Sequence, residues 1–384
     1  MILQPKKPFR ETHILQVLES FDESKMPLDR HLSFYFKSHK ALGSKDRLEI
    51  GETIFQLIRW KPLLDAKEPN PSWEKRLKTL PSLESLKNDL SISLAQRSGA
   101  SEEIFQLFAE SLGEAKAHEL LLLLNEKAPT TIRVNPLKIT RDELLKRFEN
   151  LPCKPCGMSP LGITFFKREP LFALPEYKEG FFELQDEGSQ LLAALVAAKP
   201  KQHVLDFCAG SGGKSLAIAP LLEKSGQIYL HDIRPWILQE AKKRLKRAGI
   251  ENAQCVEPNS NGLKRLKKRM DWILVDVPCS GTGSWRRHPD MKERFSKKEL
   301  FHLVGLQRTI FEQALSFLKP GGTIVYATCS LLPQENEAQV AHFLKTYPLT
   351  LVEEPLKISL TSGGCDAFFG CALTHSEGKK PVAE

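Results

Sequence analysis

From His203 onward, apolar runs of strand length alternate with stretches of helical periodicity in this chain of 384 residues. The clearest runs are 204–207, 227–231, 272–275 and 323–327. Such alternation is typical of a doubly wound parallel sheet with helices on both faces. Ligands of open sheets of this kind bind at the carboxyl ends of the strands. We therefore expect the chemistry of this chain at those ends.

The segments before residue 203 show other patterns of apolar residues. Residues 1–126 show mostly helical spacing and predict an N-terminal helical domain. Residues 127–180 mix short strand and helix signals and predict a small α+β module. We thus expect an α/β protein in which a doubly wound, Rossmann-like sheet domain at 181–374 follows these two parts and precedes a polar tail at 375–384.

Composition limits the kind of protein. A hydrophobic content of 41% with 27% charged residues is typical of a soluble globular protein, and no run approaches the roughly 18 apolar residues of a membrane span. The net charge of +8 is compatible with a polyanionic partner. With no signal-peptide pattern, we predict a cytoplasmic protein whose eight cysteines are reduced thiols. The one CxxC, 153–156, has no second ligand pair, so no metal is predicted.

Two cysteines follow strand ends. Asp276 and Cys279 come directly after the run 272–275, in a stretch that a proline and two glycines force to turn. Cys329 follows the run 323–327 in an equivalent place. Unrelated buried turns would explain these residues only by coincidence, so a thiol and carboxylate site is the stronger interpretation.

A glycine-rich loop, 208–215, follows the first strand of the sheet. A phosphate-binding P-loop needs glycine where Cys208 stands, and a dinucleotide fingerprint needs glycine where Ser215 stands. An S-adenosylmethionine site needs only close backbone approach and a carboxylate for the ribose. Asp232, 20 residues after Gly212, suits that carboxylate.

The longest motifs resemble those of the RNA 5-methylcytosine methyltransferases, and most closely their bacterial Sun or RsmB-like ribosomal RNA branch. The resemblance rests on 206–215, 276–283 and 326–330, with support from 133–135, 185–189, 286–290 and 335–337. It spans about residues 130–373. The helical segment around 41–47 is similar to the NusB-like region of that branch.

The resemblance implies S-adenosyl-L-methionine as cofactor and a two-cysteine covalent mechanism. Cys329 would attack C6 of the cytosine, Asp276 would bind the N3 edge, Cys279 would assist product release, and Lys214 would favour the Cys329 thiolate. Where the family usually has an aspartate near the adenine, this chain has an asparagine. The implied cofactor site comprises Cys208, Ala209, Gly210, Ser211, Gly212, Gly213, Lys214, Asp232, Asn259 and Asp276.

RNA is the expected partner. Arg133 and Asn135 at a strand end and Arg286 and Arg287 after the cysteine loop are the candidate RNA contacts, while the basic runs 242–247 and 264–269 are either solvated faces or phosphate contacts. The expected function is cytosine-C5 methylation of small-subunit ribosomal RNA. Transfer RNA as substrate and a catalytically silent, RNA-binding assembly factor are the alternatives. A monomer is compatible with the sequence, which leaves the oligomeric state open.

Overall fold

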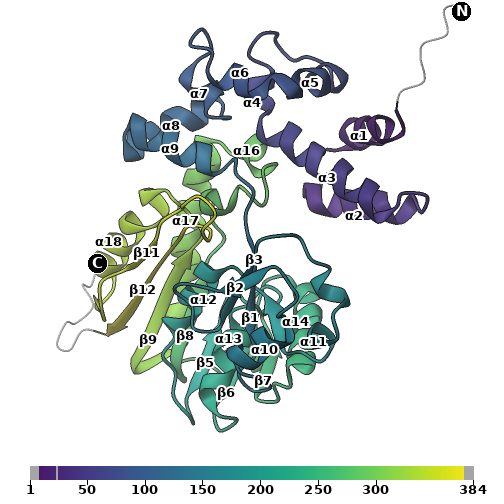
Figure 1. Ribbon diagram of the computed structural model, residues 1–384. Helices are drawn as coiled ribbons and strands as arrows, with labels where there is room; N and C mark the ends of the chain where they lie inside the picture. The colour runs from purple at the N-terminus through teal and green to yellow at the C-terminus, as the bar shows by residue number, and fades with distance from the viewer. Residues whose placement is uncertain (1–7, 23–24, 376–384) are drawn as a thin grey trace, which may run out of the picture. The chain divides into compact units, whose positions relative to one another are not determined.

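The computed structural model of the chain describes residues 8–22 and 25–375 (Figure 1). These residues form two compact units, one made of the described residues up to 127 with 284–300, and the other of 128–283 with 301–375. Apart from His375, the predicted polar tail lies outside the described residues. The segment 284–300 thus folds with the N-terminal helices, although the local sequence pattern assigned it to the sheet domain.

The larger unit contains the predicted parallel sheet, and the α/β fold class is confirmed. Its central strands run parallel in the order β9-β8-β5-β6-β7, and β12 pairs antiparallel with β9 at one side. The strands are β5 (His203–Asp206), β6 (Gln227–His231), β7 (Ala253–Val256), β8 (Met270–Asp276), β9 (Leu318–Thr328), β10 (Leu349–Leu351), β11 (Leu356–Ile358) and β12 (Phe368–His375).

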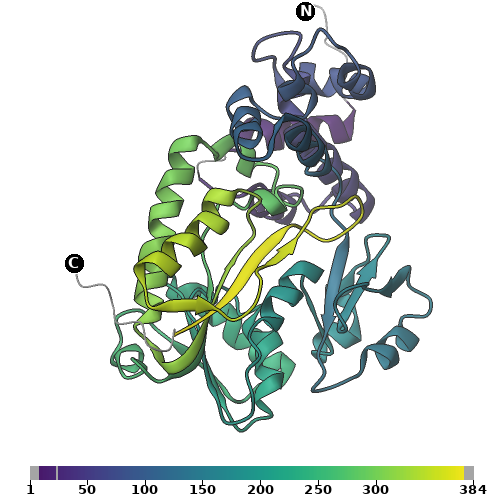
Figure 2. The ribbon, with the colours of Figure 1, turned by 90° about the vertical axis from the view of Figure 1, so that its left-hand side faces the viewer.

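Side chains alternate across this sheet, and helices cover both faces. Val204 packs in the core on one face, with helices α12 (Glu187–Ala194), α13 (Ser215–Ile218) and α14 (Pro235–Ala248). Leu205 packs in the core on the other face, with helices α17 (Lys297–Leu315) and α18 (Glu337–Thr346). Figure 2 shows α17 and α18 beside each other, and the rings of Phe311 and Phe343 stack between them at 3.7 Å. The remaining helix of this part is α15 (Asn261–Lys264).

Strand β9 begins earlier than the sequence suggests. Gly321 and Gly322 read as a turn before the strand, yet they lie within it. The register with β8 moves from Met270–Leu318 to Trp272–Thr323, so the residues between form an irregularity in which Gly321 has a positive φ of 73°. A Cβ on Gly322 would approach the carbonyl oxygens of the neighbouring strand at 3.0 Å, which explains the glycine.

A second, antiparallel sheet forms the small α+β module within the same unit. Its strand order is β2-β3-β1-β4, with elements β1 (Thr130–Val134), α10 (Arg141–Arg147), β2 (Cys153–Pro155), β3 (Gly162–Phe165), α11 (Pro175–Lys178) and β4 (Phe182–Leu184). Ile132, Ile163 and Phe182 are fully buried in its core. Strand β4 carries this sheet past the boundary at 180 that the sequence suggested.

The smaller unit is helical. Its helices are α1 (Phe9–Ser20), α2 (Leu28–Ser38), α3 (Ser44–Arg59), α4 (Lys61–Leu64), α5 (Trp73–Thr79), α6 (Leu83–Lys87), α7 (Leu94–Arg97), α8 (Glu102–Leu112), α9 (Glu114–Leu123) and α16 (Met291–Arg294). Trp285 is fully buried against Phe108 and Phe295, and the Lys292 ammonium donates to Gly99 O and Asn125 Oδ1. These contacts make 284–300 an integral part of this unit's core.

Among residues 8–22 and 25–375, no helix is long and apolar enough to cross a membrane. Within the same residues, no group of three or more His, Cys, Asp or Glu side chains is placed to hold a metal ion. All eight cysteines are free thiols.

Candidate active site

The two predicted cysteines meet because their strands are neighbours in the sheet. Strands β8 and β9 run parallel with Asp276 opposite Ala327, so their carboxyl ends lie at the same edge. Cys279 and Cys329 follow these ends, and their Sγ atoms are 3.4 Å apart. Both side chains are half-buried, which leaves them within reach of a ligand at the edge of the sheet.

The Cys279 thiol is held in its protonated form. The hydrogen bond with Cys329 and burial raise the pKa of the Cys279 thiol well above its ordinary value. Cys279 therefore keeps its proton at neutral pH, and either of the two thiols can donate the hydrogen bond that joins their sulfurs.

A lysine and an aspartate form an ion pair at the same edge. Lys214 Nζ lies 2.6 Å from Asp276 Oδ2 and both side chains are largely shielded from solvent, with exposed fractions of 12% and 31%. Burial disfavours the ammonium, but the Asp276 carboxylate outweighs that effect, and the pKa of Lys214 is raised. The Cys329 sulfur also contributes to this increase. Lys214 is thus a fixed cation that acts on the Asp276 carboxylate and the Cys329 thiol together.

The glycine loop places backbone groups beside a buried carboxylate. Gly210 N donates to Asp232 Oδ2 at 2.9 Å, which links the loop after β5 to the end of β6. Gly210 and Gly212 have positive φ values of 54° and 80°, a conformation that favours glycine. A Cβ on Gly212 would also approach Leu230 and Ala241 at 3.2 Å, tighter than most Cβ contacts.

Asp232 is prepared to act as a hydrogen-bond acceptor. It is buried, and Arg234 donates to both of its carboxylate oxygens, at 2.9 and 3.1 Å. Burial opposes ionisation, but the hydrogen bonds from Arg234 dominate and lower the pKa of Asp232. An ionised acceptor beside a close-approach glycine loop fits the ribose of a nucleoside.

Other predicted cofactor residues have simpler roles. Burial raises the pKa of the Cys208 thiol, so this thiol is unreactive, and Ala209 N donates to His231 O to fasten the loop to β6. Asn259 is exposed after β7, in a left-handed conformation with φ of 57° that asparagine tolerates. Sequence reasoning missed Asp206, whose Oδ2 accepts from Ser215 Oγ at 2.6 Å, and burial raises the pKa of this carboxyl to about 7.

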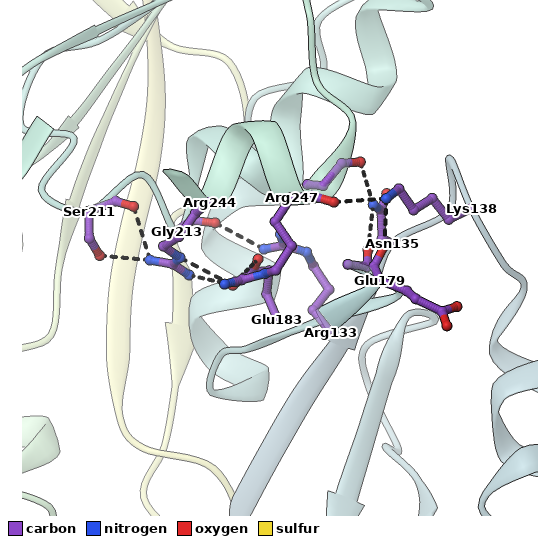
Figure 3. A network of polar contacts seen from close by, with 11 residues as sticks. Arg133, Asn135, Lys138, Glu179, Glu183, Ser211, Gly213, Arg244 and Arg247 are labelled. Atoms are coloured by element: carbon purple, nitrogen blue, oxygen red, sulfur yellow. Dashed lines mark hydrogen bonds and ion pairs between the residues drawn. The ribbon is translucent and has the colours of Figure 1, made fainter. Parts of the chain in front are cut away.

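The structure corrects the RNA contacts expected at Arg133 and Asn135. Both side chains are buried, and Figure 3 shows them in a polar network inside the larger unit. The Arg133 guanidinium donates to Gly213 O at 3.0 Å and to Gln185 Oε1. Asn135 Nδ2 donates to Gly180 O and Ala248 O, both at 2.9 Å. These residues hold the small sheet to α14 and the glycine loop, and their side-chain hydrogen bonds are made within the larger unit.

Part of the first basic run is internal as well. Arg244 and Arg247 on α14 both pair with the buried Glu183 of β4, at 3.0 and 2.5 Å (Figure 3). Arg244 also donates to Ser211 O and Oγ, at 3.0 and 2.7 Å. The two arginines of the run therefore hold β4 and the glycine loop to α14. Within this run, only Lys242, Lys243 and Lys246 are exposed.

The arginines after the cysteine loop belong to the smaller unit. Arg286 is fully buried there, and its carbonyl oxygen accepts from Arg59 Nη2 at 2.8 Å. Its side chain is therefore placed in the core of that unit, contrary to the expectation of an RNA contact. Arg287 is half-buried.

We expect Asp232→Ala to weaken S-adenosylmethionine binding by about 1–3 kcal/mol, because ribose hydroxyls lose a buried acceptor. Isothermal titration calorimetry on the full chain measures this affinity. Glu257→Ala, which removes an exposed carboxylate from the loop after the next strand, is the matched control and should bind like the wild type. Equal affinity of the two variants would remove Asp232 from the cofactor site.

Comparison with known proteins shows that the chain is similar to methyltransferases. The family model described as 16S rRNA methyltransferase RsmB/F matches residues 193–362, and the RsmF/B-like ferredoxin-like domain matches 104–170. The probable ribosomal RNA small subunit methyltransferase B of Synechocystis sp. is 33% identical over 261 residues, which are 67% of this chain and 58% of that protein. The chain thus spans little more than half the length of that relative.

Solved structures agree on the fold. A methyltransferase homolog protein from Pyrococcus horikoshii has a TM-score of 0.63 and 27% identity, covering 73% of this chain and 97% of that one. The structure of PH0851 has a TM-score of 0.81 at 19% identity, covering 97% of this chain and 100% of that one, a likeness that concerns the fold alone.

Proposed function

The chain belongs to the RsmB/F-like family of methyltransferases, whose cofactor is S-adenosyl-L-methionine, and from this premise we propose that it methylates C5 of a cytosine in small-subunit ribosomal RNA. The observation that supports the chemistry most directly is the pair of thiols 3.4 Å apart beside the Lys214–Asp276 ion pair. The cofactor supplies an electrophilic methyl group. The side chains at the strand ends must then make the carbon nucleophilic and later release the product.

C5 of cytosine is a poor nucleophile, so attack at C6 comes first. The Cys329 thiolate forms a bond to C6, and the electron pair of the C5–C6 double bond moves toward C5 and the N3 edge. Asp276, hydrogen-bonded to the Lys214 ammonium, lies at the same edge of the sheet. The pair can share a proton with N3 as negative charge develops there. C5 would then form a bond to the methyl group, and the electron pair of the broken methyl–sulfur bond would stay on the cofactor's sulfur.

Release requires a base. The C5 hydrogen leaves as a proton, its electron pair restores the C5–C6 double bond, and the C6–Sγ electrons return to Cys329. We assign the assistance in this step to Cys279. The largest cause of its raised pKa is the hydrogen bond with Cys329. In the adduct the Cys329 sulfur is a thioether, so its hydrogen bond with Cys279 is weaker. The pKa of Cys279 is then raised less at the step in which Cys279 is needed as a base.

The target base must leave its stack to reach thiols at the edge of the sheet, which is easiest in an unpaired RNA segment. For the RNA backbone we propose the second basic run as a contact surface. Its five cations are all exposed after β7: Lys264, Arg265, Lys267, Lys268 and Arg269. Arg287 remains a candidate contact from the smaller unit, since the residue is only half-buried.

We expect Lys267→Glu to weaken RNA binding and to reduce the slope of log affinity against log salt by about 0.7–0.9, because one phosphate contact and its counterion release are lost. Filter binding of radiolabelled RNA at several salt concentrations measures both quantities. Lys243→Glu makes the same charge change at an exposed lysine that already pairs with Glu240 at 3.4 Å, and its effect should be smaller. Equal slopes for the two variants would exclude the second basic run.

The decisive test of the function is methylation of purified RNA. The full chain is incubated with S-adenosylmethionine and either deproteinised small-subunit ribosomal RNA or transfer RNA, followed by bisulfite sequencing. We expect protected cytosines in the ribosomal RNA only. Protection in transfer RNA would favour the second substrate, and RNA binding without protection would favour the silent assembly factor. The two intact thiols argue against that last alternative.

A further inference from the structure

A buried carboxylate joins the two loops that carry the thiols. Glu335 is fully buried in the short helical turn η5 (Pro333–Glu335), after the loop that follows β9. Its Oε1 accepts from Ser280 N at 2.8 Å, and its Oε2 accepts from Ser280 Oγ and Ser330 Oγ, each at 2.5 Å. Ser280 directly follows Cys279, and Ser330 directly follows Cys329. One side chain therefore fixes the neighbour of each thiol.

Glu335 also accepts hydrogen bonds from residues of α17 and β9. Gln307 Nε2 on α17 donates to Glu335 Oε1 at 2.9 Å and to Pro278 O at 3.1 Å. Tyr326 Oη on β9 donates to the Glu335 carbonyl oxygen at 2.7 Å. Hydrogen bonds to a buried charged group are worth more than those between neutral groups, and each member here has a partner. The loop of Cys279 and the loop of Cys329 thus share one rigid support.

We propose that Glu335 is the positioning residue of the thiol pair, which sets the distance and orientation of Cys279 relative to Cys329. Strand pairing alone does not fix this relation, because each cysteine lies beyond the end of its strand. Since attack and release use different thiols on the same carbon adduct, both steps need this spacing, and errors of about 1 Å at a reacting group are costly. The catalytic consequence rests on the proposed function, whereas the geometric one does not.

A carboxylate suits this position better than an amide. Glu335 receives four hydrogen bonds, from Ser280 N, Ser280 Oγ, Ser330 Oγ and Gln307 Nε2. An ionised carboxylate has acceptor sites for all four, whereas a glutamine would present its NH₂ group to at least one donor. Glu335→Gln is therefore nearly isosteric but breaks the support on one oxygen.

The geometric test bridges the two thiols with dibromobimane, a reagent that becomes fluorescent when it links two sulfurs a few ångströms apart. Peptide mass spectrometry identifies the 279–329 bridge among the eight cysteines. We expect Glu335→Gln to lower the rate of this bridge at least ten-fold, with S-adenosylmethionine affinity and the thermal midpoint close to wild type. The control is Glu337→Gln, which alters a half-exposed carboxylate paired with Lys357 at 2.8 Å and should bridge normally.

Wild-type bridging in Glu335→Gln would overturn the proposal. If that variant does not fold, Ser280→Ala and Ser330→Ala decide the matter, because each removes one hydroxyl donor and leaves the carboxylate in place. Each should slow bridging, and unchanged rates in both would also overturn it. An inactive wild-type chain whose thiols bridge rapidly would refute the proposed methylation and leave the positioning role intact. In an active chain, Glu335→Gln should lower kcat with little change in KM for the cofactor.

Discussion

Cys329→Ala is expected to bind S-adenosylmethionine and RNA with near wild-type affinity and to form no covalent RNA adduct. The loss of methyl transfer should be about 10³-fold or more, because the nucleophile that activates C5 is gone and Cys279 holds its proton tightly. Denaturing electrophoresis of radiolabelled RNA incubated with the variant detects any conjugate, and filter binding verifies that RNA is still bound.

Cys279→Ala should behave in the opposite way. Attack and methyl transfer remain possible, but elimination slows, so a methylated RNA–protein conjugate should accumulate and survive denaturation. The thiols lie 3.4 Å apart, and the shared support from Glu335 reaches their neighbours Ser280 and Ser330, so removal of one thiol leaves the backbone support of the other in place. A conjugate from Cys329→Ala, with none from Cys279→Ala, would mean that the two thiols have the reverse roles.

The matched control for both variants is Cys371→Ala. Cys371 is a buried thiol on β12, within the sheet core and away from the strand ends that carry the pair. Burial raises its pKa to about 12, so it stays protonated and unreactive. Cys371→Ala should methylate and release RNA like the wild type, apart from a modest loss of thermal stability.

The sequence was sufficient to predict the strand ends because local patterns encode them. The candidate residues come where the apolar runs stop: Asp276 is the last residue of β8, and Asp232 directly follows β6. Parallel neighbours then bring such residues to one edge, which is a consequence of topology. That argument brings the loops of Cys279 and Cys329 to the same edge, whereas the spacing of the two thiols depends on contacts beyond the strand ends.

Other residues could not be placed because a polar residue looks the same in sequence whether it binds RNA or closes an internal network. Arg133 and Asn135 satisfy backbone carbonyls of distant segments, such as Gly213 O and Ala248 O, and no local pattern announces such partners. Arg286 was misjudged for a related reason. Its segment packs into the helical unit. Strand and helix periodicity gives no information on such long-range packing.

Glu335 is a residue whose structural role could not be predicted from the sequence. The sequence shows it within a motif shared with the family, but gives no sign that its carboxylate reaches both cysteine loops. That role depends on a turn after β9 that places the Glu335 carboxylate within hydrogen-bonding distance of Ser330 and Ser280. The useful signal, in retrospect, is a glutamate that stands shortly after a strand-end cysteine and ahead of an amphipathic helix.

Lys214→Met should reduce the rate of methyl transfer by about 10²–10³-fold, the usual cost of losing one preorganised electrostatic group at a site of developing charge. The ammonium lies 2.6 Å from Asp276 Oδ2 and interacts with the Cys329 sulfur, so its loss affects both the N3 edge and the nucleophile. Because the pKa of Lys214 is raised, its ammonium stays charged throughout the neutral range. Single-turnover methylation at saturating cofactor measures the rate.

Two comparisons make that result specific. Lys214→Arg keeps the cation but replaces a compact ammonium with a planar fork, so it should recover part of the lost rate. Lys243→Met removes an exposed lysine of the same unit and should leave the rate unchanged. If Lys214→Met transferred methyl groups within two-fold of wild type while Asp276→Ala did not, the carboxylate would act without its ammonium partner, and the shared-proton role at N3 would be wrong.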